Sequence, residues 1–107
     1  MAFFELRQYV VRRGKQKAWL RMFDEEVMPF EVARGIVPCG IWHGETDDSV
    51  FIWMRRFNSE KERVRLCNAV YEDPYWLKEL APRIDKLVDR KKTKVQRIVA
   101  NKKSSVQ

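Results

Sequence analysis

Three side chains near the start of the sequence could bind an anion or move a proton. Glu5, Arg7 and Tyr9 alternate with mostly apolar residues. They lie in the run Phe3–Arg12, which is rich in β-forming residues and predicts a strand. Successive strand residues point to opposite faces, so the three groups share one face. A charge buried there must be paired or contact a ligand.

A second set of candidate residues lies in the middle of the sequence. Ser49–Phe57 is a predicted strand that carries Phe51, Trp53 and Arg55 on one face. We expect these three side chains to line the same chamber as the first set and to contact a ligand. The alternative is structural: Arg55 or Arg7 pairs with Glu5, and Trp53 packs in a core.

His43 is the only histidine, and its unperturbed pKa lies near neutrality. It falls near the end of a predicted strand, Ile36–Glu45, directly after Trp42. Alternation gives His43 the same face as Ile41, so we consider it a candidate base and Trp42 a ligand contact. The alternative is an exposed histidine beside a turn.

Two aromatic residues follow a predicted helix start. Asp73 is suited to be the N-cap and Pro74 the first helical residue, with Tyr75 and Trp76 next. These rings either cover the mouth of a ligand chamber or pack against the core.

The charge of the protein is concentrated at one end. The formal net charge is +7 over 107 residues. Residues 1–82 balance 13 basic against 13 acidic side chains, and residues 83–107 hold nine basic side chains against Asp85 and Asp89. A basic patch can bind an anionic partner, but a solvated helix end and a lysine-protected edge strand explain it equally simply. We favour the second explanation and do not expect nucleic-acid binding.

Several classes of protein are not expected. No metal-binding motif, glycine-rich phosphate loop or nucleophile motif is present, so we predict no metal and no cofactor. Cys39 and Cys67 are expected to be free thiols in a reducing compartment. No apolar run is long enough to span a membrane, and we expect a soluble, cytoplasmic protein.

The remaining elements follow from periodicity and capping residues. Predicted segments are a helix over Lys15–Arg34 that kinks or ends early at Pro29, with Gly35 as its cap; a helix after the capping box Ser59–Glu62; a second helical piece from Pro74; a strand over Lys94–Ala100; and a polar tail, Asn101–Gln107.

This order, β-α-β-β-α-β, predicts one α+β domain of ferredoxin-like fold with a four-stranded antiparallel sheet. The helices cover one face, which we expect to contact Phe4 and Leu6. The other face, with Tyr9 and Trp53, would then be closed by a second subunit into a barrel. The sequence therefore predicts a homodimer.

Several stretches of the chain resemble the NIPSNAP family. They are FELRQYVVRRGK, GIWHGETDD, VFIWMRRFNSEKERVRL and AVYEDPYWLKELAPRIDKLVDR, and the resemblance extends from about Phe3 to Val99. It implies a dimeric α/β-barrel fold, shared with enzymes that act, often without a cofactor, on small aromatic or terpenoid molecules. Some of these pair a strand histidine with a tyrosine, which suggests His43 with Tyr9.

We therefore expect a homodimeric barrel that binds a small hydrophobic or aromatic metabolite. It would isomerise, cyclise or oxidise that metabolite through proton transfer, with His43 or Glu5 as base and Arg7 or Arg55 stabilising an enolate. The alternative is a non-catalytic interaction protein with a filled barrel, whose basic C-terminal region binds an acidic partner.

Overall fold

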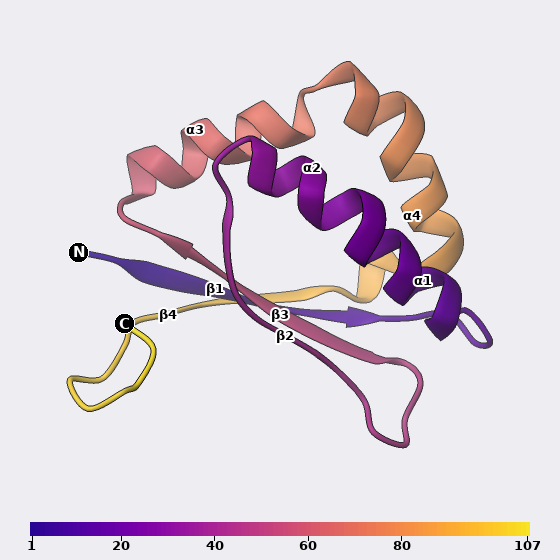
Figure 1. The fold of residues 1–107 in the computed structure, drawn as a ribbon, viewed down its shortest axis with the longest axis horizontal. Helices are drawn as coiled ribbons and strands as arrows, with labels where there is room; N and C mark the ends of the chain where they lie inside the picture. Colours follow the sequence, from indigo (N-terminus) through magenta and orange to yellow (C-terminus); the bar gives the residue numbers. More distant parts are fainter.

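A computed structural model describes residues 1–107, in which helices cover one face of a four-stranded antiparallel sheet (Figure 1). The strand order is β2-β3-β1-β4. The elements are β1 Phe3–Val10, α1 Gln16–Met22, η1 Phe23–Val27, α2 Met28–Ala33, β2 Val37–His43, β3 Val50–Phe57, α3 Glu60–Tyr71, η2 Trp76–Leu80, α4 Ala81–Leu87, η3 Arg90–Lys92 and β4 Lys94–Ile98. The predicted ferredoxin-like α+β class is confirmed.

The face of the sheet that meets the helices is the one that carries the charged residues. Glu5 is paired with Arg55 across β1 and β3, and Arg7 with Trp53. Glu5, Trp53 and Arg55 are all buried. Because helices lie on only one side of the sheet, the face that carries these three residues is the one that the helices cover. The prediction that Phe4 and Leu6 face the helices is therefore wrong.

The physical reason lies in the aromatic residues of this face. Phe51 packs edge-on against Trp19 and Phe23, with ring centroids 5.4 and 4.9 Å apart. Trp53 also packs against Phe23. These large rings bury more apolar surface against the helices than the opposite face would. Alternation separates the two sets of residues, but it does not say which set the helices cover.

Both long helical segments contain a π-helical turn that ends two residues before a proline. The turn η1 precedes Pro29, and η2 precedes Pro82. Proline has no N–H and its ring clashes with the carbonyl four residues earlier, and the wider π turn accommodates both effects. The first helix consequently continues past Pro29 to Ala33 instead of ending early.

The helix ends have the predicted caps. Gly35 has φ +101° and follows α2, and the N–H of Ile36 donates to the carbonyl of Glu31 at 3.1 Å, as in a Schellman motif. The Oγ of Ser59 accepts from the N–H of Glu62 at 3.1 Å. Removing such an N-cap typically costs about 1 kcal/mol. These caps fix the helix ends, and with them the last turn that holds Glu31.

No helix covers the outer face of the sheet, which we define as the face turned away from the helices (Figure 1). Apolar residues remain exposed there, including Val37, Trp42 and Ile98. The indole ring of Trp42 lies over Gly40 of its own strand. A Cβ at Gly40 would lie only 2.3 Å from that ring. Only the end near both termini is partly covered.

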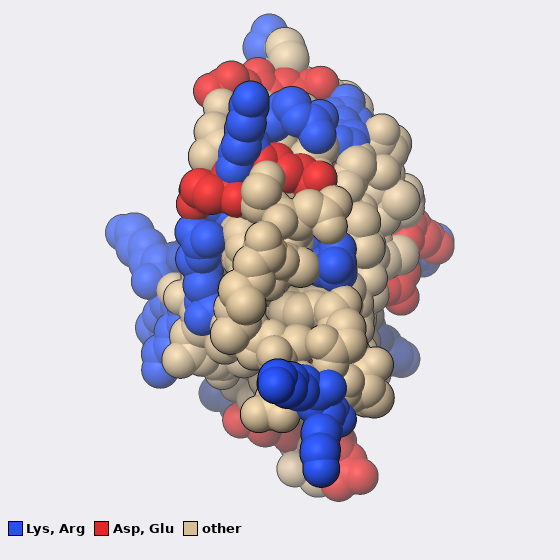
Figure 2. Space-filling view, turned by 90° about the vertical axis from the view of Figure 1, so that its left-hand side faces the viewer, with Lys and Arg blue, Asp and Glu red and all other residues tan.

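That cover is the C-terminal tail, which folds back beside the start of β1 (Figure 1). Phe4, Met54, Ile98 and Val106 line a shallow groove there, and Arg56 donates from Nε to the main-chain oxygen of Gln107 at 2.9 Å. Seen from this end, uncharged surface fills the middle and charged side chains surround it (Figure 2).

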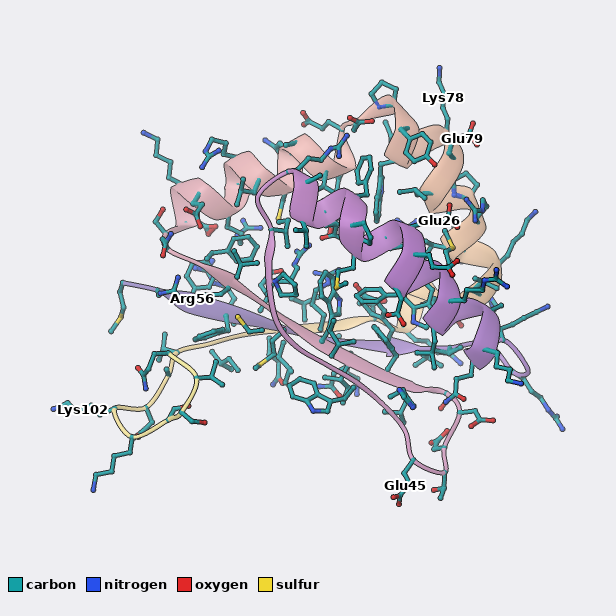
Figure 3. All side chains as sticks on the ribbon, in the orientation of Figure 1. Glu26, Glu45, Arg56, Lys78, Glu79 and Lys102 are labelled. Carbon is teal, nitrogen blue, oxygen red and sulfur yellow. The ribbon has the colours of Figure 1, made fainter.

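Charged side chains otherwise extend away from the two layers. Lys78 and Glu79 extend from the helix layer, Lys102 from the tail and Glu45 from the tip of the β2–β3 hairpin (Figure 3). None of the helices is long and apolar enough to cross a membrane.

Candidate functional site

A cleft of about 440 Å³ lies between the charged face of the sheet and the helices. Its walls are mainly apolar, and its polar groups come from β1, α2, α3 and the segment that joins α4 to β4. The lining consists of Arg7, Tyr9, Trp19, Val27, Glu31, Tyr71, Trp76, Ile84, Val88, Arg90, Thr93 and Val95. Apolar walls with a few polar groups are typical of small-molecule sites.

A buried arginine organises the polar side of this cleft. Arg55 is 1% exposed, and its Nη2 donates to Oε1 of Glu5 at 2.6 Å. Its Nη1 donates to Oε1 of Glu31 at 2.7 Å and to the hydroxyl of Tyr71 at 2.8 Å. Charge-assisted bonds of this kind offset the cost of burying the ions. One guanidinium therefore connects a strand carboxylate to a helix carboxylate.

A second group of hydrogen bonds converges on Tyr9. The hydroxyl of Tyr9 accepts from Nε1 of Trp53 at 2.9 Å and from Nε of Arg7 at 3.0 Å. Nη1 of Arg7 lies 3.5 Å from Oε1 of Glu5, which links this group to Arg55. The network runs without interruption from Trp53 to Glu31.

The two carboxylates of the network have different surroundings. Glu5 lies within 4 Å of guanidinium nitrogens of Arg7, Arg55 and Arg63, whereas Glu31 pairs with Arg55 alone. Burial raises the pKa of Glu31, and Arg55 only partly opposes that effect. Oε2 of Glu31 accepts no hydrogen bond within the chain, and Glu31 lines the cleft. Glu31 is therefore the carboxyl group suited to exchange a proton with a bound molecule.

Tyr71 adds a second polar group on the helix side. Burial raises the pKa of its hydroxyl, and the neighbouring Glu31 raises it further. The phenol therefore stays protonated at neutral pH and can donate a hydrogen bond.

The sequence-predicted site residues fall into three groups. Arg7, Tyr9 and Trp76 line the cleft. Four more are buried on the inner side of the sheet: Glu5, Phe51, Trp53 and Arg55. Three lie elsewhere: His43 is exposed near the hairpin tip, Trp42 is on the outer face, and Tyr75 is half exposed and stacks on Phe30.

The most informative cleft residue that sequence reasoning missed is Glu31. The residues Phe23, Val27 and Glu31 follow one another at intervals of four, which places them on one helix face. That spacing is a usable signal, because it puts a carboxyl group on an otherwise apolar face. The π turn at η1 brings the same face onto the sheet.

Arg90, which the sequence analysis assigned to a solvated helix end, also belongs to the lining of the cleft.

No group of three or more His, Cys, Asp or Glu side chains gathers in a way that would hold a metal ion. Cys67 lies 3.7 Å from Nη2 of Arg55, and burial raises the pKa of its thiol, which keeps it protonated.

The fold matches several solved structures over nearly the whole chain. A NIPSNAP family protein from Agrobacterium tumefaciens has a TM-score of 0.87 at 21% identity, with 100% of both chains covered. An uncharacterized NIPSNAP domain protein from Burkholderia xenovorans has a TM-score of 0.82 at 16% identity, covering 95% of this chain and 97% of the other. Such low identities show a shared fold only.

A more distant match is an enzyme. SnoaB, a cofactor-independent oxygenase from Streptomyces nogalater, has a TM-score of 0.73 at 12% identity, with 97% of both chains covered. No functionally curated protein matches the sequence. The family model for NIPSNAP, in contrast, matches residues 4–101. Because that match includes almost the entire chain, this protein belongs to the NIPSNAP family.

Proposed function

We propose that the cleft binds a small apolar or aromatic metabolite and promotes proton transfer in it without a bound cofactor. The observation that carries this proposal is the contrast within the cleft. A continuous network of buried polar groups, from Trp53 to Glu31, faces walls made by aromatic and aliphatic side chains. An open cleft of about 440 Å³ also favours ligand binding over the non-catalytic alternative.

The roles follow from which groups have hydrogen-bond donors or acceptors without a partner in the chain. Glu31 is the proton acceptor or donor, because Oε2 has no partner within the chain. Tyr9 donates a hydrogen bond to a carbonyl or phenol oxygen of the ligand, where negative charge develops when an adjacent C–H loses its proton. The proton moves from that carbon to Glu31 and can return to a different carbon, which is an isomerisation.

This chemistry requires no metal or redox cofactor. Proton removal from an activated carbon is a first step that isomerisation and cyclisation share. The likeness to SnoaB, a cofactor-independent oxygenase, supports a reaction carried by side chains alone. Among the candidate residues, His43 receives no role in this scheme, because it lies outside the cleft lining.

The functional assembly in this proposal is a homodimer. The outer face of the sheet leaves Val37, Trp42 and Ile98 between 40% and 49% exposed, and Ile52 and Met54 are only half-buried. Contiguous exposed apolar surface typically marks an interface. Pairing of two outer faces would bury it and form the barrel, with each cleft on the helix side of its own subunit.

Two free cysteines are in keeping with a cytoplasmic location.

Tryptophan fluorescence tests the location of the ligand. Trp76 lines the cleft, and Trp42 lies on the outer face. Titration with a panel of small aromatic ketones and phenols should quench the emission of the wild-type protein. The quenching should weaken in Trp76→Phe and persist in Trp42→Phe. Loss of the signal in Trp42→Phe instead would place the ligand between subunits and contradict the proposal.

Hydrogen exchange tests the chemistry. For a ligand that binds, the C–H next to its carbonyl should exchange with D2O about a hundredfold faster with protein than in buffer, as seen by NMR. Glu31→Gln should remove that acceleration and leave binding in place. Equal rates with and without protein would show a binding protein and not an enzyme.

A further inference from the structure

The cleft contains hydrogen-bond donors that have no acceptor within the chain. The clearest is the hydroxyl of Tyr9. Its oxygen already accepts from Trp53 at 2.9 Å and from Arg7 at 3.0 Å, so both of its lone pairs are in use. The O–H hydrogen must therefore be donated, and no protein group accepts it. Tyr9 lines the cleft, so a ligand oxygen is the group that can accept it.

Arg7 also has N–H donors without an acceptor in the chain. Its Nε donates to Tyr9, while Nη1 is 3.5 Å from Glu5 and Nη2 has no partner in the chain. Only one side-chain nitrogen or oxygen is both buried and without a hydrogen-bond partner, and it is Nε1 of Trp19. The terminal nitrogens of Arg7 make no hydrogen bond, so they must be accessible. Because Arg7 lines the cleft, these N–H groups reach it.

The indole N–H of Trp19 differs from these two donors. It has no acceptor, but its nitrogen is buried from solvent, so it does not open into the cleft. The donors of Tyr9 and Arg7 are therefore the ones that can bind oxygen acceptors of a ligand.

One exposed basic side chain belongs to the lining of the cleft. Arg90 lines it, and its side chain is 46% exposed. Asp85 lies 3.4 Å from Arg90, so part of this charge is offset. An exposed guanidinium at this position attracts anions toward the cleft.

The charges inside the cleft also favour an anion. Arg7 and Arg55 face Glu5 and Glu31, which gives a sum of zero when all four are ionised. Of the charged residues that line the cleft, Arg7 and Arg90 outnumber Glu31 by one positive charge. A single negative charge on the ligand restores neutrality.

We infer that the ligand of this cleft is a monocarboxylate with an apolar or aromatic body, whose carboxylate is bound by Arg7. The body lies between Trp19 and Trp76, and the exposed Arg90 attracts the carboxylate. This inference rests on the proposed function and specifies its substrate class.

The test compares acids with their uncharged amides. Suitable probes are 2-naphthoate with 2-naphthamide, 3-phenylpropionate with its amide, and octanoate with octanamide, each titrated calorimetrically. Wild-type protein should bind at least one acid about tenfold or more tightly than its amide, because a hydrogen-bonded charge pair contributes that much. Arg7→Gln should abolish the preference for the acid over the amide, whereas Arg7→Lys should retain part of it.

The comparison on the wild-type protein needs no variant, so a folding defect in Arg7→Gln does not prevent the test. Amides that bind as tightly as the acids would overturn the inference and leave the proposed apolar-ligand function standing. No binding by any acid at about 1 mM would also overturn it. If the uncharged ketones and phenols fail as well, the proposed function falls with it.

Discussion

Both faces of the sheet depart from the pattern of an ordinary two-layer domain. The inner face, against the helices, carries Glu5 and Arg55 among its aromatic residues, both at least 95% buried. The outer face carries apolar residues such as Trp42 and Ile98, which are 49% and 40% exposed. A solvated sheet face is normally polar and a covered face apolar. Here a charged network lies within the covered apolar face, and apolar residues lie on the uncovered one, so each face contains a local inversion of the usual pattern.

Each inversion corresponds to a different proposed partner. Charges on the covered face are paired with one another through Arg55, yet Arg7, Tyr9 and Glu31 keep unused hydrogen-bonding capacity toward the cleft. The proposed partner of that side is a small molecule. The outer face has apolar area with no internal cover, and its proposed partner is a second subunit. The difference separates ligand binding from assembly within a single sheet.

The largest effect should come from removing the charge at the centre of the inner face. Arg55→Met leaves Glu5 and Glu31 buried without their shared guanidinium, which should lower the free energy of unfolding by about 3–5 kcal/mol. The measurement is urea unfolding followed by circular dichroism, at one fixed protein concentration.

Arg83→Met is the matched control for that experiment. Arg83 also forms an ion pair with a glutamate, Glu26, but both side chains are at least a third exposed. Its replacement should cost below about 1 kcal/mol. Equal losses for the two variants would mean that burial of the Arg55 network adds nothing to its strength, and the contrast between the faces would disappear.

The next effect should come from placing a charge on the outer face. Ile52 lies on β3 opposite Trp42, in the middle of that face. Ile52→Glu should weaken self-association about a hundredfold, or ~2.8 kcal/mol, because the carboxylate would be desolvated in the interface. Sedimentation equilibrium measures the dissociation constant.

Leu77→Glu is the corresponding control on the helix layer, where Leu77 is 56% exposed. It should leave the association unchanged. A monomeric wild-type protein at micromolar concentration, or a dimer that Ile52→Glu leaves intact, would refute the assignment of the outer face as the interface.

A smaller effect concerns pH. The pKa of Glu31 is raised above its ordinary value of 4.5 by burial, so the folded state holds the proton more tightly than the unfolded state. The stability that this proton contributes is complete below pH 4.5 and is lost as pH rises through the folded-state pKa. Glu31→Gln mimics the protonated form, so its stability relative to wild type should increase as pH rises through the folded-state pKa of Glu31.

Glu26 provides the opposite sign. Its hydrogen bond from Arg83 lowers the pKa of this carboxyl, so its contribution is present above its ordinary pKa and is lost as pH falls. Glu26→Gln should therefore lose stability relative to wild type as pH rises from 3 to 6. Urea unfolding at each pH measures both differences. Parallel pH profiles for the two variants would contradict the assignment of Glu31 as the carboxyl with the raised pKa.

The sequence was sufficient for the order of the elements and insufficient for the site. Period-two and helical spacing, with caps at Ser59 and Gly35, report local backbone preferences, and these survive in the structure. Which face of the sheet meets the helices depends on long-range packing of Phe23 against Phe51 and Trp53. Nothing local encodes that choice, so alternation grouped Glu5, Arg7 and Tyr9 on one strand face but did not show that the helices cover this face.

The same limit explains individual residues. Glu31 and Arg90 enter the cleft because helix and linker segments distant in sequence converge on β1. Their types alone are compatible with exposed helix positions, where most Glu and Arg residues are found. His43 is the converse case: a chemically suitable side chain is exposed at the end of β2 and does not line the cleft.

The smallest expected effect is therefore that of His43→Ala. The side chain is exposed and makes no hydrogen bond or ion pair in the chain, so unfolding free energy should change by less than about 0.5 kcal/mol. Exchange of the ligand C–H should continue at the wild-type rate, whereas Tyr9→Phe, inside the cleft, should slow it about tenfold or more. A tenfold loss with His43→Ala and none with Tyr9→Phe would move the reaction to the hairpin end of the sheet. The inner face would then be a structural network, and the inversion of the two faces would serve assembly alone.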